Sequence, residues 1–178
     1  MALTLDPALS LALRGGLALL LAAAAWHKLR DLTAFRAALA GYQLVPERAL
    51  RVAACVLIAA ELATASALVL SSRAAGAAVT LLALYTGAVA LNLARGRREI
   101  DCGCFGPAAR QPLSCALVVR NLGLIALGLV CALPVAARAL VLLDGLTIAA
   151  GIALGALLHG AINGLIANAP RLRALRGV

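Results

Sequence analysis

Long apolar runs separated by short polar breaks make up most of this chain. Five runs, at about residues 8–26, 50–70, 74–94, 113–133 and 140–167, are long enough to be membrane helices. A helix rises about 1.5 Å per residue, so about 20 residues cross about 30 Å of hydrocarbon. The alternating apolar and polar residues of barrel strands are not evident. The pattern therefore predicts a helical membrane protein.

The connection after the first run has a pattern of its own. In "HKLRDLTAFRAALAGYQLVPERAL", apolar residues recur at helical spacing with charges between them, which predicts a short amphipathic helix at the membrane interface. The connections "SSRAAG" and "PVAAR" are short, so the runs they join are expected to be antiparallel neighbours. If all five runs cross the membrane, the amphipathic segment, the third connection and the C-terminal tail share one side. The amphipathic segment can then fold over the third connection.

The fold expected from this pattern is an all-α membrane protein. It is a bundle of about five transmembrane helices, a four-helix core plus one, with the interfacial amphipathic segment after the first span. Residues 1–178 are expected to form a single integral membrane domain. A cleavable signal peptide over Arg14 and the following alanine-rich stretch is the alternative. It is disfavoured because the apolar run extends back to Ala8.

Composition and charge narrow the class of protein. Apolar residues make up 64% of the chain and charged residues 13%, far from the values of soluble domains. The net charge is +9, but the basic residues lie in the connections and no aromatic base-stacking surface is evident, so nucleic-acid binding is not expected. Most Lys and Arg residues flank the side of the third connection, and the opposite side has only Arg73 and Arg138. By the positive-inside rule, the third connection is cytoplasmic.

The third connection, "REIDCGCFGPAARQPLSC", carries the candidate chemistry. Cys102 and Cys104 are separated only by Gly103. A disulfide across one residue closes a strained ring that is easily reduced, which suits exchange better than structural cross-linking, and glycine allows the unusual backbone angles. Upstream arginines and the start of the following helix favour a thiolate, whereas Glu99 and Asp101 oppose it. Cys115 is a candidate resolving thiol or a buried structural cysteine.

Metal binding is the main alternative use of these cysteines. Two thiolates suit Cu(I), with Cys115 or His27 as a further ligand. A closed zinc site is not expected, because the second Cys/His pair is missing, and no metal is assigned in the leading interpretation. Cys55 and Cys131 lie in apolar runs and are expected to pack in the core. His27 and His159 are expected to be interfacial or packing residues.

Ionisable residues inside the apolar runs call for partners, because an unpaired charge in the membrane is costly. Glu61 and Arg120 lie at depths of roughly 16 and 10 Å from the same side, so they are the preferred ion pair, with Asn121 adding hydrogen bonds. Arg14 and Asp144 are a second expected pair. The last run also carries "GIALG" and "GAING", whose small residues four apart indicate close helix packing.

Four motifs together give a family resemblance: "WHKLRD" closing the first span, a lone Glu in the second, "CGCFG" between the third and fourth, and "RN" inside the fourth. Residues 11–133 resemble the MauE/DoxX-type family of redox-associated membrane proteins. The resemblance implies a helical bundle that works with thioredoxin-like proteins in making or handling disulfides, and its methylamine-utilisation members are needed to mature a disulfide-rich dehydrogenase subunit. The family pattern falls on Lys28, Asp31, Glu61, Cys102, Gly103, Cys104, Phe105, Gly106, Arg120 and Asn121.

The layout is also similar, by analogy, to vitamin K epoxide reductase, in which a quinone takes the electrons, so a quinone is a candidate cofactor. This chain differs in having CxC in place of CxxC and no cysteine in the long connection. The expected function is a thiol–disulfide oxidoreductase, or its electron-transfer partner, that is multi-pass in the cell membrane and acts with a thioredoxin-like protein. The resemblance puts the cysteines outside the cytoplasm, against the charge count. A Cu(I) carrier and a non-catalytic anchor for a redox partner are the alternatives, and nothing in the sequence indicates an oligomeric state.

Overall fold

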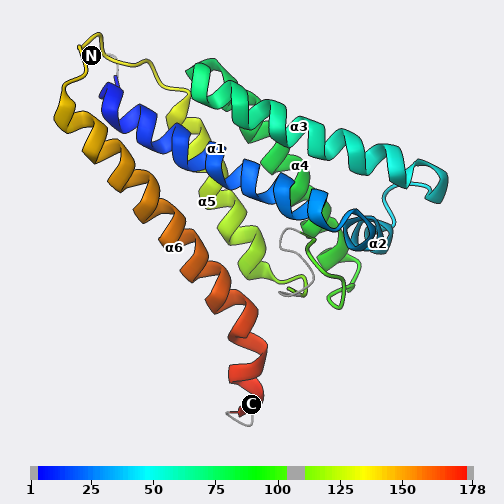
Figure 1. Cartoon of the computed structure of the whole chain (residues 1–178). Helices are drawn as coiled ribbons and strands as arrows, with labels where there is room; N and C mark the ends of the chain where they lie inside the picture. The colour runs from blue at the N-terminus through cyan, green and yellow to red at the C-terminus, as the bar shows by residue number, and fades with distance from the viewer. Residues whose placement is uncertain (1–3, 104–110, 176–178) are drawn as a thin grey trace.

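Helices account for nearly all of the regular structure. The computed structural model describes residues 4–103 and 111–175, with side chains to residue 169 (Figure 1). The helices are α1 (Pro7–Arg30), α2 (Leu32–Tyr42), α3 (Leu50–Leu70), α4 (Ala75–Ala94), α5 (Cys115–Cys131) and α6 (Leu142–Leu175). Single 3-10 turns at Glu47–Ala49 and Ser72–Ala74 precede α3 and α4.

The prediction of an all-α membrane protein with about five long helices is confirmed. Four stretches are long and apolar enough to cross a bilayer: Pro7–Arg30, Glu47–Leu70, Ser72–Ala94 and Leu142–Ala169. The helix α5 is also apolar but shorter, with 17 residues. The chain is therefore a multi-pass membrane protein.

The helix α1 lies at the centre of the arrangement. It packs against α3 on one side and α6 on another and also contacts α5, while α4 packs against α5 (Figure 1). The core between α1, α3, α4 and α5 contains Leu17, Leu21, Leu68, Ala78, Leu82 and Cys131. The most apolar stretch of α6 has no buried residue, so this helix covers α1 from outside. This arrangement is the four-helix core plus one that the sequence predicts.

Small residues allow α1 and α6 to approach closely. A Cβ atom on Gly15 would lie 2.6 Å from the side chain of Ile152, and one on Gly151 would lie 3.1 Å from Ala12 Cβ. The predicted close packing is thus confirmed for Gly151. It is wrong for the other glycines of the two motifs, Gly155, Gly160 and Gly164, because no atom lies within 4 Å of a Cβ built on any of them.

An exposed charge cluster joins the start of α1 to the start of α6. Asp6 caps α1 by accepting a hydrogen bond from the Ala8 N–H at 2.8 Å. Arg138, in the connection between α5 and α6, forms salt bridges with Asp6 at 3.0 Å and with Asp144 at 2.8 Å. The predicted pairing of Arg14 with Asp144 is therefore wrong. Asp144 lies in the first turn of α6, within reach of Arg138 in the short connection.

The electrostatics of this cluster follow from its hydrogen bonds. The bonds to Asp144 and then Asp6 raise the pKa of Arg138. Desolvation tends to raise the pKa of Asp6, but the Ala8 N–H and Arg138 outweigh it and hold the Asp6 pKa below its usual value. Both shifts favour the charged forms of Asp6 and Arg138, which attract each other.

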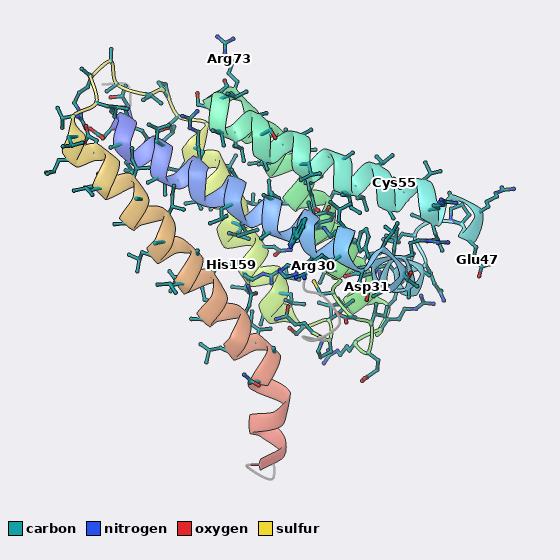
Figure 2. The ribbon with its side chains drawn as sticks, in the orientation of Figure 1. Arg30, Asp31, Glu47, Cys55, Arg73 and His159 are labelled. Atoms are coloured by element: carbon teal, nitrogen blue, oxygen red, sulfur yellow. The ribbon has the colours of Figure 1, made fainter. Side chains whose placement is uncertain are left out.

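The turn between α1 and α2 folds the amphipathic segment back over the bundle. The helix α1 continues to Arg30, beyond the predicted end at Trp26. Asp31 then caps α2, because its carboxylate accepts a hydrogen bond from the Ala34 N–H at 2.8 Å. Figure 2 shows Asp31 near one end of the bundle and Arg73 at the other. The predicted amphipathic helix is therefore present, and the Asp31 carboxylate fixes its starting point.

Candidate functional site

The cysteine segment is closed at its base by a short antiparallel pairing. The Cys102 N–H donates to the Gln111 carbonyl at 2.9 Å, and the Leu113 N–H donates to the Ile100 carbonyl at 3.1 Å. The pairing lies immediately before α5, so it brings the two ends of the polar interruption to the head of that helix. Three candidate residues, Cys104, Phe105 and Gly106, lie outside the described residues.

Asp101 and Gly103 shape the turn that follows. The Asp101 carboxylate accepts hydrogen bonds from the Gly103 N–H at 3.2 Å and the Gln111 N–H at 3.3 Å. Gly103 has φ of +72°, a conformation that disfavours side chains, and a Cβ there would lie 3.2 Å from Ala38 Cβ on α2. Glycine is therefore favoured by the backbone angle, and a side chain there would also crowd α2.

The helix α2 covers Cys102. The cysteine is 9% exposed and packs with Tyr42, Val89, Leu113 and Leu117. The Tyr42 hydroxyl donates to the Cys102 carbonyl at 3.2 Å. The prediction that the amphipathic segment meets the cysteine loop is thus confirmed for Cys102.

The other described cysteines have different surroundings. Cys115, the candidate resolving thiol, is the exposed first residue of α5. Cys131 is buried in the core, as predicted, whereas Cys55 lies exposed on α3, so the packing prediction is wrong for Cys55 (Figure 2). Within residues 4–103 and 111–169, no group of three or more His, Cys, Asp or Glu side chains is placed to hold a metal ion.

A buried ion pair lies below the cysteine segment. Lys28 forms a salt bridge with Glu61, and the two side chains are 3% and 0% exposed. The Tyr85 hydroxyl donates to the same Glu61 oxygen at 2.8 Å, which joins α1, α3 and α4. The predicted Glu61–Arg120 pair is therefore wrong. Because α1 extends to Arg30, Lys28 lies on the helix beside α3 and not in a free connection.

Phe35 of α2 connects this ion pair to the cysteine segment. The Lys28 ammonium lies 5.1 Å from the centre of the Phe35 ring and 4.8 Å from that of Tyr85, within cation–π range. The same Phe35 ring would lie 3.7 Å from a Cβ on Gly103. Through Phe35, α2 therefore contacts both the buried ion pair and the backbone beside Cys102.

Arg120 takes part in a separate polar network between α5 and α6. Its guanidinium donates to Asn121 Oδ1 at 2.8 and 3.2 Å and to Asn163 Oδ1 at 2.6 Å. The Gln111 side chain donates to the Asn163 carbonyl at 3.4 Å, which ties the network to the cysteine segment. Among the described residues, no carboxylate forms a salt bridge with Arg120.

Sequence reasoning missed three of these participants, Tyr85, Gln111 and Asn163. Tyr85 and Asn163 are polar residues inside apolar runs, which is the signal that marks functional or partnered positions in membrane helices. Gln111 carried no comparable signal, because it lies in a polar connection.

A cavity of about 570 Å³ lies between α1, α5 and α6. Its walls are mostly apolar, and its polar residues are His27, Glu61, Tyr85, Arg120, Asn121 and His159. His159 lies on α6 (Figure 2). The cavity therefore brings together two charged residues that the sequence predicted as a direct pair, Glu61 and Arg120.

Together, the spanning helices and the cysteine segment at one end define a multi-pass helical membrane protein with a candidate thiol site. Residues 6–134 match the family described as "Methylamine utilisation protein MauE". The chain belongs to the MauE family.

Curated relatives carry the same description. The MauE protein of Paracoccus denitrificans is 45% identical over 128 residues, which cover 70% of this chain and 69% of the relative. That of Methylorubrum extorquens is 43% identical over 144 residues, covering 78% and 77%. That of Paracoccus versutus is 38% identical over 136 residues, covering 74% and 73%. No solved structure matches the chain.

Proposed function

We propose that this protein is a membrane thiol–disulfide oxidoreductase, or the electron-transfer partner of one, with Cys102 and Cys104 as the redox pair. It acts with a thioredoxin-like protein during maturation of a disulfide-containing protein. The family description supports an accessory role in methylamine utilisation. The observation that carries the proposal is the attachment of α2 to the cysteine segment, through the Tyr42–Cys102 hydrogen bond and the contact at Gly103.

The chemistry is a two-electron exchange. A thiolate of the thioredoxin-like protein attacks the Cys102–Cys104 disulfide, and one of these two sulfurs leaves as a thiolate. The second thiol of the partner then resolves the mixed disulfide. The partner is oxidised to its disulfide, and Cys102 and Cys104 receive two electrons and two protons. The reverse sequence uses the same intermediates.

The surrounding residues act as positioning residues in this proposal. Asp101 and Gly103 set the backbone angles between the two cysteines. Phe35 holds α2 against both Gly103 and Lys28. The geometry of a disulfide across one residue depends on the backbone of that residue, so these contacts bear on the proposed Cys102–Cys104 ring.

The test is exchange with a thioredoxin-like protein by the purified full chain. Replacing Cys102 or Cys104 with Ser should abolish exchange, and one of the two single variants should trap a mixed disulfide with the partner. Cys55→Ser is the matched control, because Cys55 is exposed on α3 and should not affect exchange. Unchanged exchange in both single variants would contradict the proposal.

The cysteine variants, together with Phe35→Glu, separate the two other classes of function. One ion per chain in the reduced protein, lost in Cys102→Ser, would favour a Cu(I) carrier. If the cysteines were dispensable while Phe35→Glu abolished partner binding, the protein would be an anchor.

We further propose that the cysteine segment faces the extracytoplasmic side, where exported thioredoxin-like proteins would meet it. A thiol reagent that cannot cross membranes should label this segment in intact cells. Comparison with the Cys102→Ser/Cys104→Ser variant identifies the labelled residues. Labelling only after cell disruption would place the segment in the cytoplasm.

A further inference from the structure

The cavity between α1, α5 and α6 has a shape and lining suited to an elongated apolar ligand. It runs along α1 from Leu9 to His27, about 18 residues or roughly 27 Å of helix. Its other walls come from α5 and from Gly155, Ala156 and Gly160 of α6. Both α5 and α6 contact α1, but they contact each other little, which leaves this space open between them.

The polar side of the cavity carries hydrogen-bonding capacity that the described residues do not use. Glu61 is fully buried and lines the cavity, and its Oε2 has no hydrogen-bond partner among the described residues. The three hydrogen bonds of Arg120 go to amide oxygens, and a guanidinium has five N–H donors, so two remain. Leaving such groups unpaired in a dry interior costs free energy. The cavity therefore offers one acceptor and at least one donor to a ligand.

We propose that this cavity binds a lipid-soluble quinone and its quinol. Arg120 donates to a carbonyl oxygen of the quinone, and Glu61 Oε2 accepts a hydrogen bond from the hydroxyl of the quinol. The apolar tail lies along α1 and α6. The head group is neutral in both redox states, so it enters a site roughly 16 Å deep without losing the hydration of a charge.

Other amphiphiles match the cavity less well. A fatty-acid carboxylate would pair with Arg120 but would face the carboxylate of Glu61. The charged head group of a phospholipid would have to leave water, which is costly inside the membrane. The free donor of Arg120 suits the carbonyl of a quinone, and the free acceptor of Glu61 suits the hydroxyl of its quinol.

The cavity is structurally linked to the cysteine segment. Leu117, which packs with Cys102, lies one turn before Arg120 on α5, roughly 4.5 Å along the helix. Gln111, whose carbonyl binds the Cys102 N–H, is joined through Asn163 to Arg120. In the proposed function, two thiols lose two electrons and two protons, and a quinone that accepts both becomes a quinol. The role of the quinone as electron acceptor thus rests on the proposed function, whereas the binding of the quinone to the cavity does not.

The test is retention of a ubiquinone by the full-length protein. Purified protein is reconstituted into phosphatidylcholine discs that contain the quinone, extracted again into quinone-free detergent, and analysed for quinone bound per chain. Gly155→Leu places a side chain in the cavity, whereas Gly164→Leu lies on the same helix away from it, and a Cβ at either position meets no atom within 4 Å. The wild type and Gly164→Leu should retain about one quinone per chain, and Gly155→Leu should bind about tenfold more weakly.

A second pair of variants tests the polar contact. Arg120→Gln should bind the quinone about tenfold more weakly, because it replaces a charged hydrogen-bond donor with a neutral one. Arg14→Gln, another arginine within a span but outside the cavity lining, should bind normally. Equal retention by Gly155→Leu and Gly164→Leu, or displacement of the quinone by equimolar oleate, would overturn the proposal.

Cys102→Ser separates this proposal from the proposed function. This variant should still retain the quinone although exchange is lost. Normal exchange without any retained quinone contradicts the cavity proposal alone, and retention without exchange in the wild type contradicts the proposed function alone.

Discussion

Two charge clusters lie at opposite ends of α1, and they differ mainly in their access to water. At one end, Lys28, Glu61 and Tyr85 join α1 to α3 and α4, with Lys28 and Glu61 almost fully buried. At the other end, Arg138 joins Asp6 and Asp144, with Arg138 40% and Asp6 47% exposed. Both clusters contain Asp or Glu paired with Lys or Arg. Only in the first cluster must the protein alone supply the partners of the charged groups, because water does not reach them.

The difference indicates how each cluster contributes. A buried pair has paid a large desolvation cost, so removing one partner leaves a charge that nothing hydrates. An exposed pair replaces hydrogen bonds to water with similar bonds to protein, and the net gain is small. The buried cluster lies next to Phe35, which contacts Gly103, and next to the cavity, so its desolvation cost arises close to the cysteine segment.

The largest expected effect comes from breaking the buried pair on one side. Lys28→Met leaves Glu61 buried and unpaired, and should lower the free energy of unfolding by about 3–5 kcal/mol. Unfolding in mixed detergent micelles, followed by circular dichroism, measures the loss.

The double variant Lys28→Met/Glu61→Met is the control for that experiment. It removes both charges together, so it should recover most of the lost stability. A loss below about 1 kcal/mol in the single variant would mean that water reaches the pair.

A smaller effect is expected from the hydroxyl that supports Glu61. Tyr85→Phe removes one hydrogen bond to a carboxylate and should cost about 1.5 kcal/mol in the same unfolding assay. The neighbouring Thr86→Val is the matched control, since its hydroxyl donates to the Leu82 carbonyl within the same helix. If Thr86→Val cost more than Tyr85→Phe, the tyrosine would not be part of the buried network.

The smallest effect is expected at the exposed cluster. Arg138→Gln should lower stability less than Tyr85→Phe, and raised ionic strength should shrink the difference from the wild type. Lys28→Met should show little dependence on salt, because its neighbours are dry. If the stability loss in Arg138→Gln did not depend on salt, the two clusters would not differ in their access to water.

The exposed cluster should also show a weak acid dependence. Because the folded pKa of Asp6 is below its unfolded value, the stability from Asp6 is present above the ordinary pKa of aspartate and lost as the pH falls through the lowered pKa. Arg138→Gln should flatten this acid part of the stability profile, measured as unfolding against pH. An unchanged profile would show that Arg138 does not hold the Asp6 pKa down.

The number of helices, the fold class and the position of α2 could be predicted, because each depends on a pattern among residues close together in the chain. Length and apolar content mark each span, and the spacing of residues such as Leu32, Phe35 and Leu39 marks the amphipathic helix. The Cys-Gly-Cys spacing likewise marks a candidate exchange site, whatever surrounds it.

The choice of partners could not be predicted in the same way. Glu61 lies within plausible depth of both Lys28 and Arg120, and the sequence does not say which helix presents its charge to α3. Glu61 pairs with Lys28 because α1 continues to Arg30, so that Lys28 lies inside the bundle. Arg120 instead pairs with Asn163, which α6 places beside it. Asp31 shows the same limit, since its role as a helix cap appears only when α2 turns back.

The sequence by itself determined the apolar spans, the interfacial helix and the Cys-Gly-Cys spacing, because these depend on the pattern of neighbouring residues. Only the tertiary structure decided that Lys28 neutralises Glu61, that α2 fastens to Cys102, and that Glu61 and Arg120 face a shared cavity. Those outcomes depend on helix length and packing angle. A shift of one helical turn moves a charge about 5 Å, which is enough to exchange one partner for another.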